Sequence, residues 1–238
     1  MRGNKGKESR ELYPIGRVPE YIIKKIGKSL TYKYLIGQTK LSGDEWGDIF
    51  ADAVGGEHLA SPLGIADVVY KNMAWSTKTI QHNHPHREST IRIISGRCSP
   101  TYSLGKTERL ADPTGTGSGA VDIYNERLND SKALYEPLRI IILVRNMETL
   151  QFSIYETDAV RYNPEEYSWS LNVNDNIEGH EKRTGIHKFT WQDHGAQLTI
   201  KYDVPASAQK FTIKAPPVLD FEETMQQIKY NDNWVTIL

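Results

Sequence analysis

The sequence predicts an α/β protein in which helices flank a mixed β-sheet and a β-rich extension follows toward the C-terminus. Three observations predict it. A capped amphipathic helix precedes a β-hairpin within the first 80 residues, residues 138–144 form a predominantly apolar strand, and residues 196–202 and 210–214 alternate as strands do. A chain of 238 residues is long enough to bury a sizeable core, so we expect one compact unit.

Composition excludes several classes of protein. With 38% hydrophobic and 25% charged residues, the composition suggests neither a disordered chain nor a membrane protein. The longest apolar run, residues 140–144, is too short to cross a membrane, and residues 1–10 are too polar for a signal peptide, so we expect a cytoplasmic location. The single cysteine, Cys98, excludes an internal disulfide and a cysteine-based zinc cage. A net charge of -1 does not exclude DNA binding, because basic residues can gather on one face.

Two helices are expected before residue 60. Residues 18–26 carry apolar side chains at helical spacing behind a helix-compatible proline. Ser42 and Glu45 then form a capping box, and a helix with a buried stripe follows and stops at residues 55–56. The stripe consists of Trp46, Ile49, Phe50 and Ala53.

The remaining elements follow from alternation and from Gly and Pro punctuation. Residues 65–70 and 74–80 form a hairpin around a three-residue turn, and residues 101–119 are expected to be a loop because they are rich in Gly, Ser, Thr and Pro. A helix over 120–134 and strands over 138–144 and 150–155 complete the core sheet. The stretch 221–238 is too mixed to assign.

The hairpin carries one carboxylate and one lysine that converge. Asp67 lies among residues that prefer burial, and Ser76 and Lys78 share one face of the second strand because side chains alternate along a strand. Phosphodiester hydrolysis uses this combination: a carboxylate holds Mg²⁺ against a phosphate oxygen, and a lysine orients water and offsets negative charge. An ordinary Asp–Lys ion pair between strands explains the spacing equally well.

The segment 64–69, followed by 74–79, resembles the signature hairpin of the PD-(D/E)XK nucleases, and the resemblance covers roughly residues 42–100. It implies that Asp67 is a Mg²⁺ ligand, that the backbone carbonyl of Thr77 is another, and that Lys78 is the catalytic lysine. The chain departs from the motif in two respects: the acid expected two residues before the lysine is Ser76, and no proline precedes Asp67. We retain Ser76 as a site residue in a variant D...SxK motif.

A replacement acid must come from elsewhere. Family members often place a glutamate near the preceding helix, which makes Glu57 the first choice as catalytic residue and metal ligand. Glu45, Asp48 and Asp52 lie on one helical face and are alternatives, although a solvated acidic face also explains them. Glu88 is a further alternative.

Other patterns have competing interpretations. The alternating His82, His84 and His86 share a face if the chain is extended and could bind a transition metal, although Pro85 interrupts the strand. The aromatic residues of the C-terminal half favour a sugar-binding surface or core packing. They are Tyr162, Tyr167, Trp169 and Trp191.

Base recognition requires side chains such as Arg, Lys, Asn and Gln. Arg97 is expected on a turn just after the catalytic strand, and the segment around residues 172–192 supplies further candidates, although any solvated loop has similar residues. The candidate DNA-binding residues are Arg97, Lys182, Arg183, Lys188 and Gln192.

Together these features predict a PD-(D/E)XK catalytic core over residues 1–158 and a β-rich DNA-recognition extension over residues 159–238. The predicted function is that of a type II restriction endonuclease that cuts double-stranded DNA with Mg²⁺, as a homodimer by analogy and without membrane contact. A repair or mobile-element nuclease and a non-catalytic DNA-binding protein, suggested by Ser76, remain alternatives.

Overall fold

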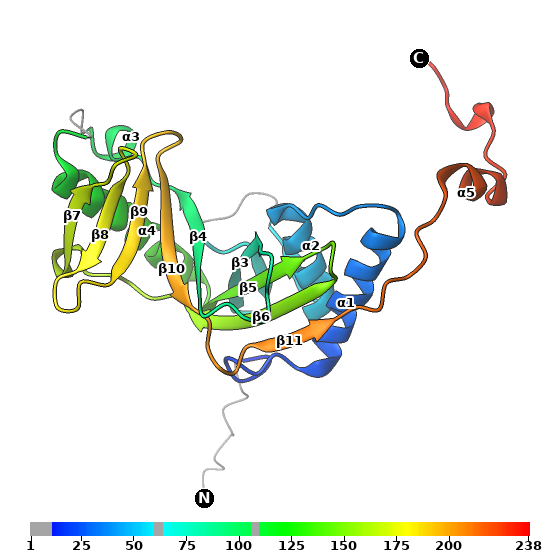
Figure 1. Cartoon of the computed structure of the whole chain (residues 1–238), viewed down its shortest axis with the longest axis horizontal. Helices are drawn as coiled ribbons and strands as arrows, with labels where there is room; N and C mark the ends of the chain where they lie inside the picture. Colours follow the sequence, from blue (N-terminus) through cyan, green and yellow to red (C-terminus); the bar gives the residue numbers. More distant parts are fainter. Residues whose placement is uncertain (1–10, 60–63, 106–109) are drawn as a thin grey trace, which may run out of the picture.

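The computed structural model of the chain describes residues 11–59, 64–105 and 110–238, which form two β-sheets and five α-helices (Figure 1). One sheet has six strands in the order β1-β2-β3-β5-β6-β11, and the other has five in the order β4-β10-β9-β8-β7. The predicted α/β class is therefore confirmed.

The six-stranded sheet is mixed. Its strands are β1 (Glu57–His58), β2 (Val68–Tyr70), β3 (Met73–Gln81), β5 (Leu138–Asn146), β6 (Gln151–Asp158) and β11 (Gln209–Thr212). Strands β3 and β5 pair in parallel, and all the other neighbours pair antiparallel. A parallel pair needs a crossover connection, and the chain between β3 and β5 makes it through β4 and two helices.

The five-stranded sheet is antiparallel. Its strands are β4 (Thr90–Arg97), β10 (Gln197–Asp203), β9 (His187–Gln192), β8 (Ile177–Glu181) and β7 (Tyr167–Leu171). Strand β4 comes from the N-terminal part of the chain, and β11 returns to the six-stranded sheet from the C-terminal part. The expected boundary at residue 158 therefore does not separate the two sheets.

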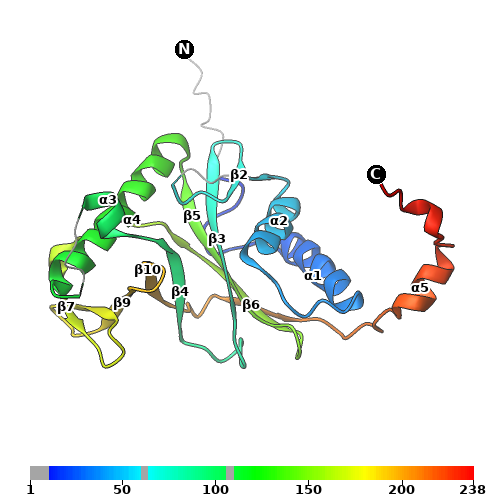
Figure 2. The same ribbon diagram turned by 90° about the horizontal axis from the view of Figure 1, so that it is seen from above.

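Helices α1 (Glu20–Leu35) and α2 (Gly43–Val54) cover one face of the six-stranded sheet (Figure 2). The capping box of Ser42 and Glu45 is confirmed, and Gly55 ends α2 in the left-handed conformation. The predicted first helix is confirmed and runs on to Leu35, because the buried stripe continues to Leu30. The Phe50 ring meets Trp75 of β3 edge to face at 5.3 Å, which joins helix and sheet.

Helix α4 (Pro113–Leu134) lies on the other side of the six-stranded sheet, where its apolar residues share one core with both sheets (Figure 2). The expected loop over 101–119 is therefore wrong within the described residues, since α3 (Pro100–Leu104) also forms there. Asp112 caps α4 by accepting a hydrogen bond from the Gly115 N–H at 2.8 Å. At Gly117 an added Cβ would lie 2.2 Å from the Trp169 ring, so this glycine serves close packing of helix on sheet.

The hairpin is confirmed as β2 and β3, with β2 shorter than expected. The strands expected over 138–144, 150–155 and 196–202 appear as β5, β6 and β10, each shifted or extended by a few residues, and β11 covers part of the strand expected over 210–214. Cys98 is a buried thiol, and burial raises its pKa to about 11, which leaves it unreactive.

A buried ionic network ties the N-terminal segment to the six-stranded sheet. Glu156 accepts hydrogen bonds from Tyr13 Oη and Trp75 Nε1, both at 2.7 Å, and from Arg139 Nη1 at 3.2 Å. The charged side chains of Arg139 and Glu156 are 1% and 0% exposed. A buried charge requires such partners, so this network fixes the register of β3, β5 and β6.

After β11 the chain runs away from the body and includes α5 (Phe221–Gln227) and the 3₁₀ turn η2 (Asp232–Trp234); a second 3₁₀ turn, η1 (Pro164–Glu166), precedes β7 (Figures 1 and 2). Of the helices in the described part of the chain, none combines the length and apolar character that a membrane crossing requires.

Candidate active site

Asp67 is the centre of the candidate site. Its Oδ2 accepts hydrogen bonds from the Thr77 backbone N–H at 2.8 Å, from Ser76 Oγ at 3.2 Å and from Lys78 Nζ at 3.3 Å. The Asp67 and Lys78 side chains are 19% and 20% exposed, so both can still reach a ligand. The predicted convergence of the carboxylate and the lysine is confirmed.

Local structure explains this convergence. Val68 of β2 pairs with Trp75 of β3, which sets Asp67 beside the start of the β3 segment that carries Ser76 and Lys78 on one face. Just before Asp67, the Ile65 N–H donates to Ser131 Oγ of α4 at 2.8 Å. The backbone leading to Asp67 is thus anchored to α4, and the Asp67 carboxylate is held by donors of β3.

The site opens into a cavity of about 410 Å³ between α2 and the hairpin. Its lining residues are Gly43, Asp44, Asp48, His58, Leu59, Asp67, Thr77 and Lys78. Asp48 Oδ1 lies 2.8 Å from His58 Nδ1. An added Cβ at Gly47 would lie 2.4 Å from the His58 ring, so this glycine allows β1 to bring the imidazole against α2.

The predicted replacement acid, Glu57, is not brought into the cavity. It is exposed on β1, and the neighbouring His58 lines the cavity instead. Since β1 has two residues, its position could not be read from sequence periodicity. The only acid among the alternatives that does line the cavity is Asp48.

The other proposed acids are engaged elsewhere. Glu45 contacts Lys33 and caps α2, and these hydrogen bonds, from the Lys33 ammonium first and the Ser42 N–H second, lower its pKa to about 2. Asp52 lines a different cavity, against α1. Glu88 pairs with His82 at 3.2 Å. Sequence reasoning missed Asp44 and His58 as cavity residues, and the capping box was the signal that could have placed Asp44 near the start of α2.

The three alternating histidines have separate surroundings. His82 pairs with Glu88, His84 is exposed, and His86 Nε2 lies 3.1 Å from the Phe152 carbonyl and 3.2 Å from that of Phe211. They do not form a metal-binding group in the part of the chain that the structure describes.

The predicted DNA-binding residues are dispersed. Arg97 ends β4 and is not on a turn, and it lines a cavity of about 380 Å³ together with Arg127. Lys182 and Arg183 are exposed between β8 and β9, and Gln192 ends β9.

Lys188 differs from the other candidates because it contacts the protein itself. Its Nζ donates to the Lys201 carbonyl at 2.8 Å and lies 5.4 Å from the ring centres of Tyr162 and Tyr202. Desolvation by burial lowers the pKa of Lys188. We therefore remove Lys188 from the set of residues that could contact DNA.

The aromatic residues considered for sugar binding belong to the core. Tyr167, Trp169 and Trp191 are buried, and Phe189 meets the rings of Tyr162, Tyr167 and Trp169 at 4.7 to 5.7 Å. Core packing is therefore the correct interpretation of this group.

Donor chemistry at the cavity fits Mg²⁺. This ion takes oxygen ligands, retains several waters and is usually held by one or two carboxylates together with substrate phosphates. Asp67 supplies a carboxylate whose Oδ2 is already fixed by three donors, and two further acidic residues, Asp44 and Asp48, line the same cavity.

No significant match to this chain was found among protein-family models, curated proteins or solved structures.

Proposed function

We propose that this protein is a Mg²⁺-dependent endonuclease of the type II restriction kind that cuts double-stranded DNA. The observation that carries the proposal is the meeting of the Asp67 carboxylate, the Thr77 backbone and the Lys78 ammonium at the wall of one acidic cavity. An ordinary ion pair between strands explains the Asp–Lys contact but not the two further acidic residues, Asp44 and Asp48, that line the same cavity.

The fold adds support to this proposal. The PD-(D/E)XK resemblance implies a mixed sheet flanked by helices, and the six-stranded sheet is mixed and has α1 and α2 on one face and α4 on the other. The hairpin with Asp67 and Lys78 lies within this sheet, next to the parallel strand β5.

In the proposed site Asp67, the Thr77 carbonyl and Asp48 hold Mg²⁺, with Asp48 in the role first given to Glu57. When bound, the ion polarises a phosphate oxygen and lowers the pKa of a bound water. The Lys78 ammonium offsets the negative charge that develops on the phosphate, and its 3.3 Å contact with Asp67 keeps it at the reacting centre. Ser76 Oγ fixes the Asp67 carboxylate from the side where the family motif has an acid.

For DNA recognition we retain Arg97, Lys182, Arg183 and Gln192, whose donors and acceptors suit base edges or phosphates. Cutting both strands calls for two such sites, so we propose a homodimer as the active form. A repair or mobile-element nuclease uses the same site chemistry and differs in preferring a DNA structure to a short sequence.

A non-catalytic DNA-binding protein is the second candidate function. It is favoured by one observation: a hydroxyl, Ser76 Oγ, lies 3.2 Å from Asp67 Oδ2 at the position where the motif has a carboxylate. Such a protein would hold DNA equally well without Mg²⁺.

The test is digestion of a plasmid of known sequence with and without Mg²⁺. Wild-type protein is compared with Asp67→Asn and Lys78→Ala, and Glu57→Gln is the matched control because Glu57 lies near the cavity but outside it. We expect discrete Mg²⁺-dependent fragments from the wild type and the control and none from the two site variants. Circular dichroism of each variant checks its folding.

Intact DNA in every lane would overturn the endonuclease. Retention of labelled duplex in a gel-shift assay, equal with and without Mg²⁺, would then establish the binding protein. No retention would reject both functions.

A further inference from the structure

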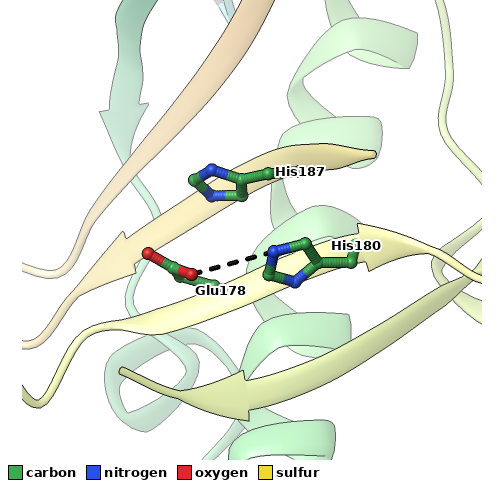
Figure 3. A group of neighbouring side chains, drawn as sticks. All are labelled: Glu178, His180 and His187. Carbon is green, nitrogen blue, oxygen red and sulfur yellow. Dashed lines mark ion pairs between the residues drawn. The ribbon is translucent and has the colours of Figure 1, made fainter. Parts of the chain in front are cut away.

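A second group of metal-ligating side chains lies on the outer face of the five-stranded sheet, outside the candidate active site. Figure 3 shows Glu178 and His180 along β8 and His187 beside them on β9. Glu178 and His180 are two residues apart and so share a face, and the strand register pairs His180 with His187. The sequence did not single out this group, because its members meet only through the β8–β9 pairing.

The ligand atoms of the three side chains all lie within 4.8 Å of one another, and the residues are half-buried. Within the described residues this is the one group of three such side chains. The two imidazole rings stack with centres 4.9 Å apart, and His180 Nε2 lies 3.8 Å from Glu178 Oε2. Two histidines and one carboxylate are a common ligand set for zinc and related transition metals, and water completes the coordination.

Outer contacts orient two of the ligands. His187 Nε2 lies 2.7 Å from the Phe189 carbonyl, so this nitrogen donates and Nδ1 carries the lone pair. Asn172 Nδ2 donates to Glu178 Oε1 at 2.8 Å, which leaves Oε2 toward His180. Metal-binding histidines commonly donate their second N–H to a carbonyl in this way.

One neighbour opposes a cation. The Arg92 guanidinium, from β4, lies 3.1 Å from His187 Nδ1, the atom that a metal would use. Without a metal, this arginine is the partner of His187 Nδ1. A metal must displace it, so Arg92 sets the affinity of the group.

We propose that Glu178, His180 and His187 bind a divalent transition metal, with Zn²⁺ as the best-suited ion. The metal joins β8 to β9 at the base of the turn over residues 182–186, which carries Lys182 and Arg183. It thereby stabilises the hairpin that presents these basic side chains, whether or not the protein cuts DNA.

Isothermal titration of EDTA-treated protein with Zn²⁺ alone tests this proposal, and Co²⁺ absorption spectra report the ligands. We expect one ion per chain, affinity lower by about 10-fold or more in His187→Ala and in Glu178→Gln, and no change in His84→Ala, whose histidine is exposed elsewhere. Arg92→Met removes the competing charge and should tighten binding by about tenfold.

Two results would overturn the proposal: no Zn²⁺ binding by the wild type, or binding that His187→Ala leaves unchanged. The three proposed ligands lie on a sheet surface, and thermal unfolding of each variant without metal checks that the variant folds. The measurement uses no DNA, so its outcome is independent of the endonuclease test.

Discussion

Replacing Arg139 by methionine tests whether the buried ionic network holds the sheet together. Arg139 Nη1 lies 3.2 Å from Glu156 Oε2, and both side chains are almost completely inaccessible to water. Across that distance, at an effective dielectric constant of about 20, the attraction between the two charges is about 5 kcal/mol. Part of it offsets desolvation, and breaking a buried pair by removing one partner costs roughly 3–5 kcal/mol.

We therefore expect Arg139→Met to lower the free energy of unfolding by roughly 3–5 kcal/mol, a large part of the 5–15 kcal/mol typical of a folded domain. Urea titration followed by tryptophan fluorescence measures it, since Trp75 donates to Glu156. Arg145→Met is the matched control on the same strand, because its guanidinium donates hydrogen bonds to three neutral oxygens, and a loss of about 1–2 kcal/mol is expected there.

The pH dependence provides a second readout. Burial raises the pKa of Glu156, and the Arg139 charge is one of the groups that oppose this rise. Without Arg139 the folded-state pKa rises further above the ordinary value of 4.5, so the folded variant loses stability as pH rises through that range. The penalty should be smaller at pH 5 than at pH 8. A penalty equal to that of Arg145→Met at both pH values would refute the reasoning.

Three further predictions concern the site and its supports. Asp48→Asn should slow Mg²⁺-dependent cleavage by roughly 10- to 100-fold. Asp52 is on the same helix but lines another cavity, so Asp52→Asn should leave the cleavage rate unchanged. Equal rates of plasmid digestion by the two variants would reject Asp48 as the second acid. Gly117→Ala places a methyl 2.2 Å from a tryptophan ring and should lower the free energy of unfolding by roughly 1–3 kcal/mol. Gly27→Ala, in open space on α1, should raise it by roughly 0.5–1 kcal/mol, and urea titration distinguishes the two. The Glu45 pKa of about 2 is below its ordinary 4.5, so the stability it contributes is present above pH 4.5 and disappears as pH falls toward 2. Because this side chain is one-third exposed, its contribution is small. On acid titration, the free energy of unfolding of Glu45→Gln should therefore fall by about 1 kcal/mol less than that of the wild type.

The elements predicted correctly are those whose signal is local. The capping box at Ser42 and the apolar run of β5 each specify an element from neighbouring residues alone, and both are confirmed. The loop over 101–119 was wrong because the glycines suggested flexibility, while Gly117 serves close packing against Trp169, which is more than 50 residues away in sequence. The burial of Arg139 within an apolar strand also depends on distant partners, Tyr13 and Glu156.

The same distinction applies to the candidate site. Asp67 and Lys78 could be predicted together because one short hairpin joins them, so strand alternation and turn length fix their distance. Asp48, which we propose as the second acid, lies on a different element, and its position depends on how α2 packs over β1. Gly47 leaves room for the His58 ring, which lies 2.8 Å from Asp48, and both Asp48 and His58 line the cavity while Glu57 does not. If the packing at Gly47 sets this arrangement, Gly47→Ala should displace the His58 imidazole and weaken the proposed Mg²⁺ binding without changing any of the proposed ligands. Unchanged Mg²⁺ affinity in that variant would show that Asp48 takes its position independently of β1.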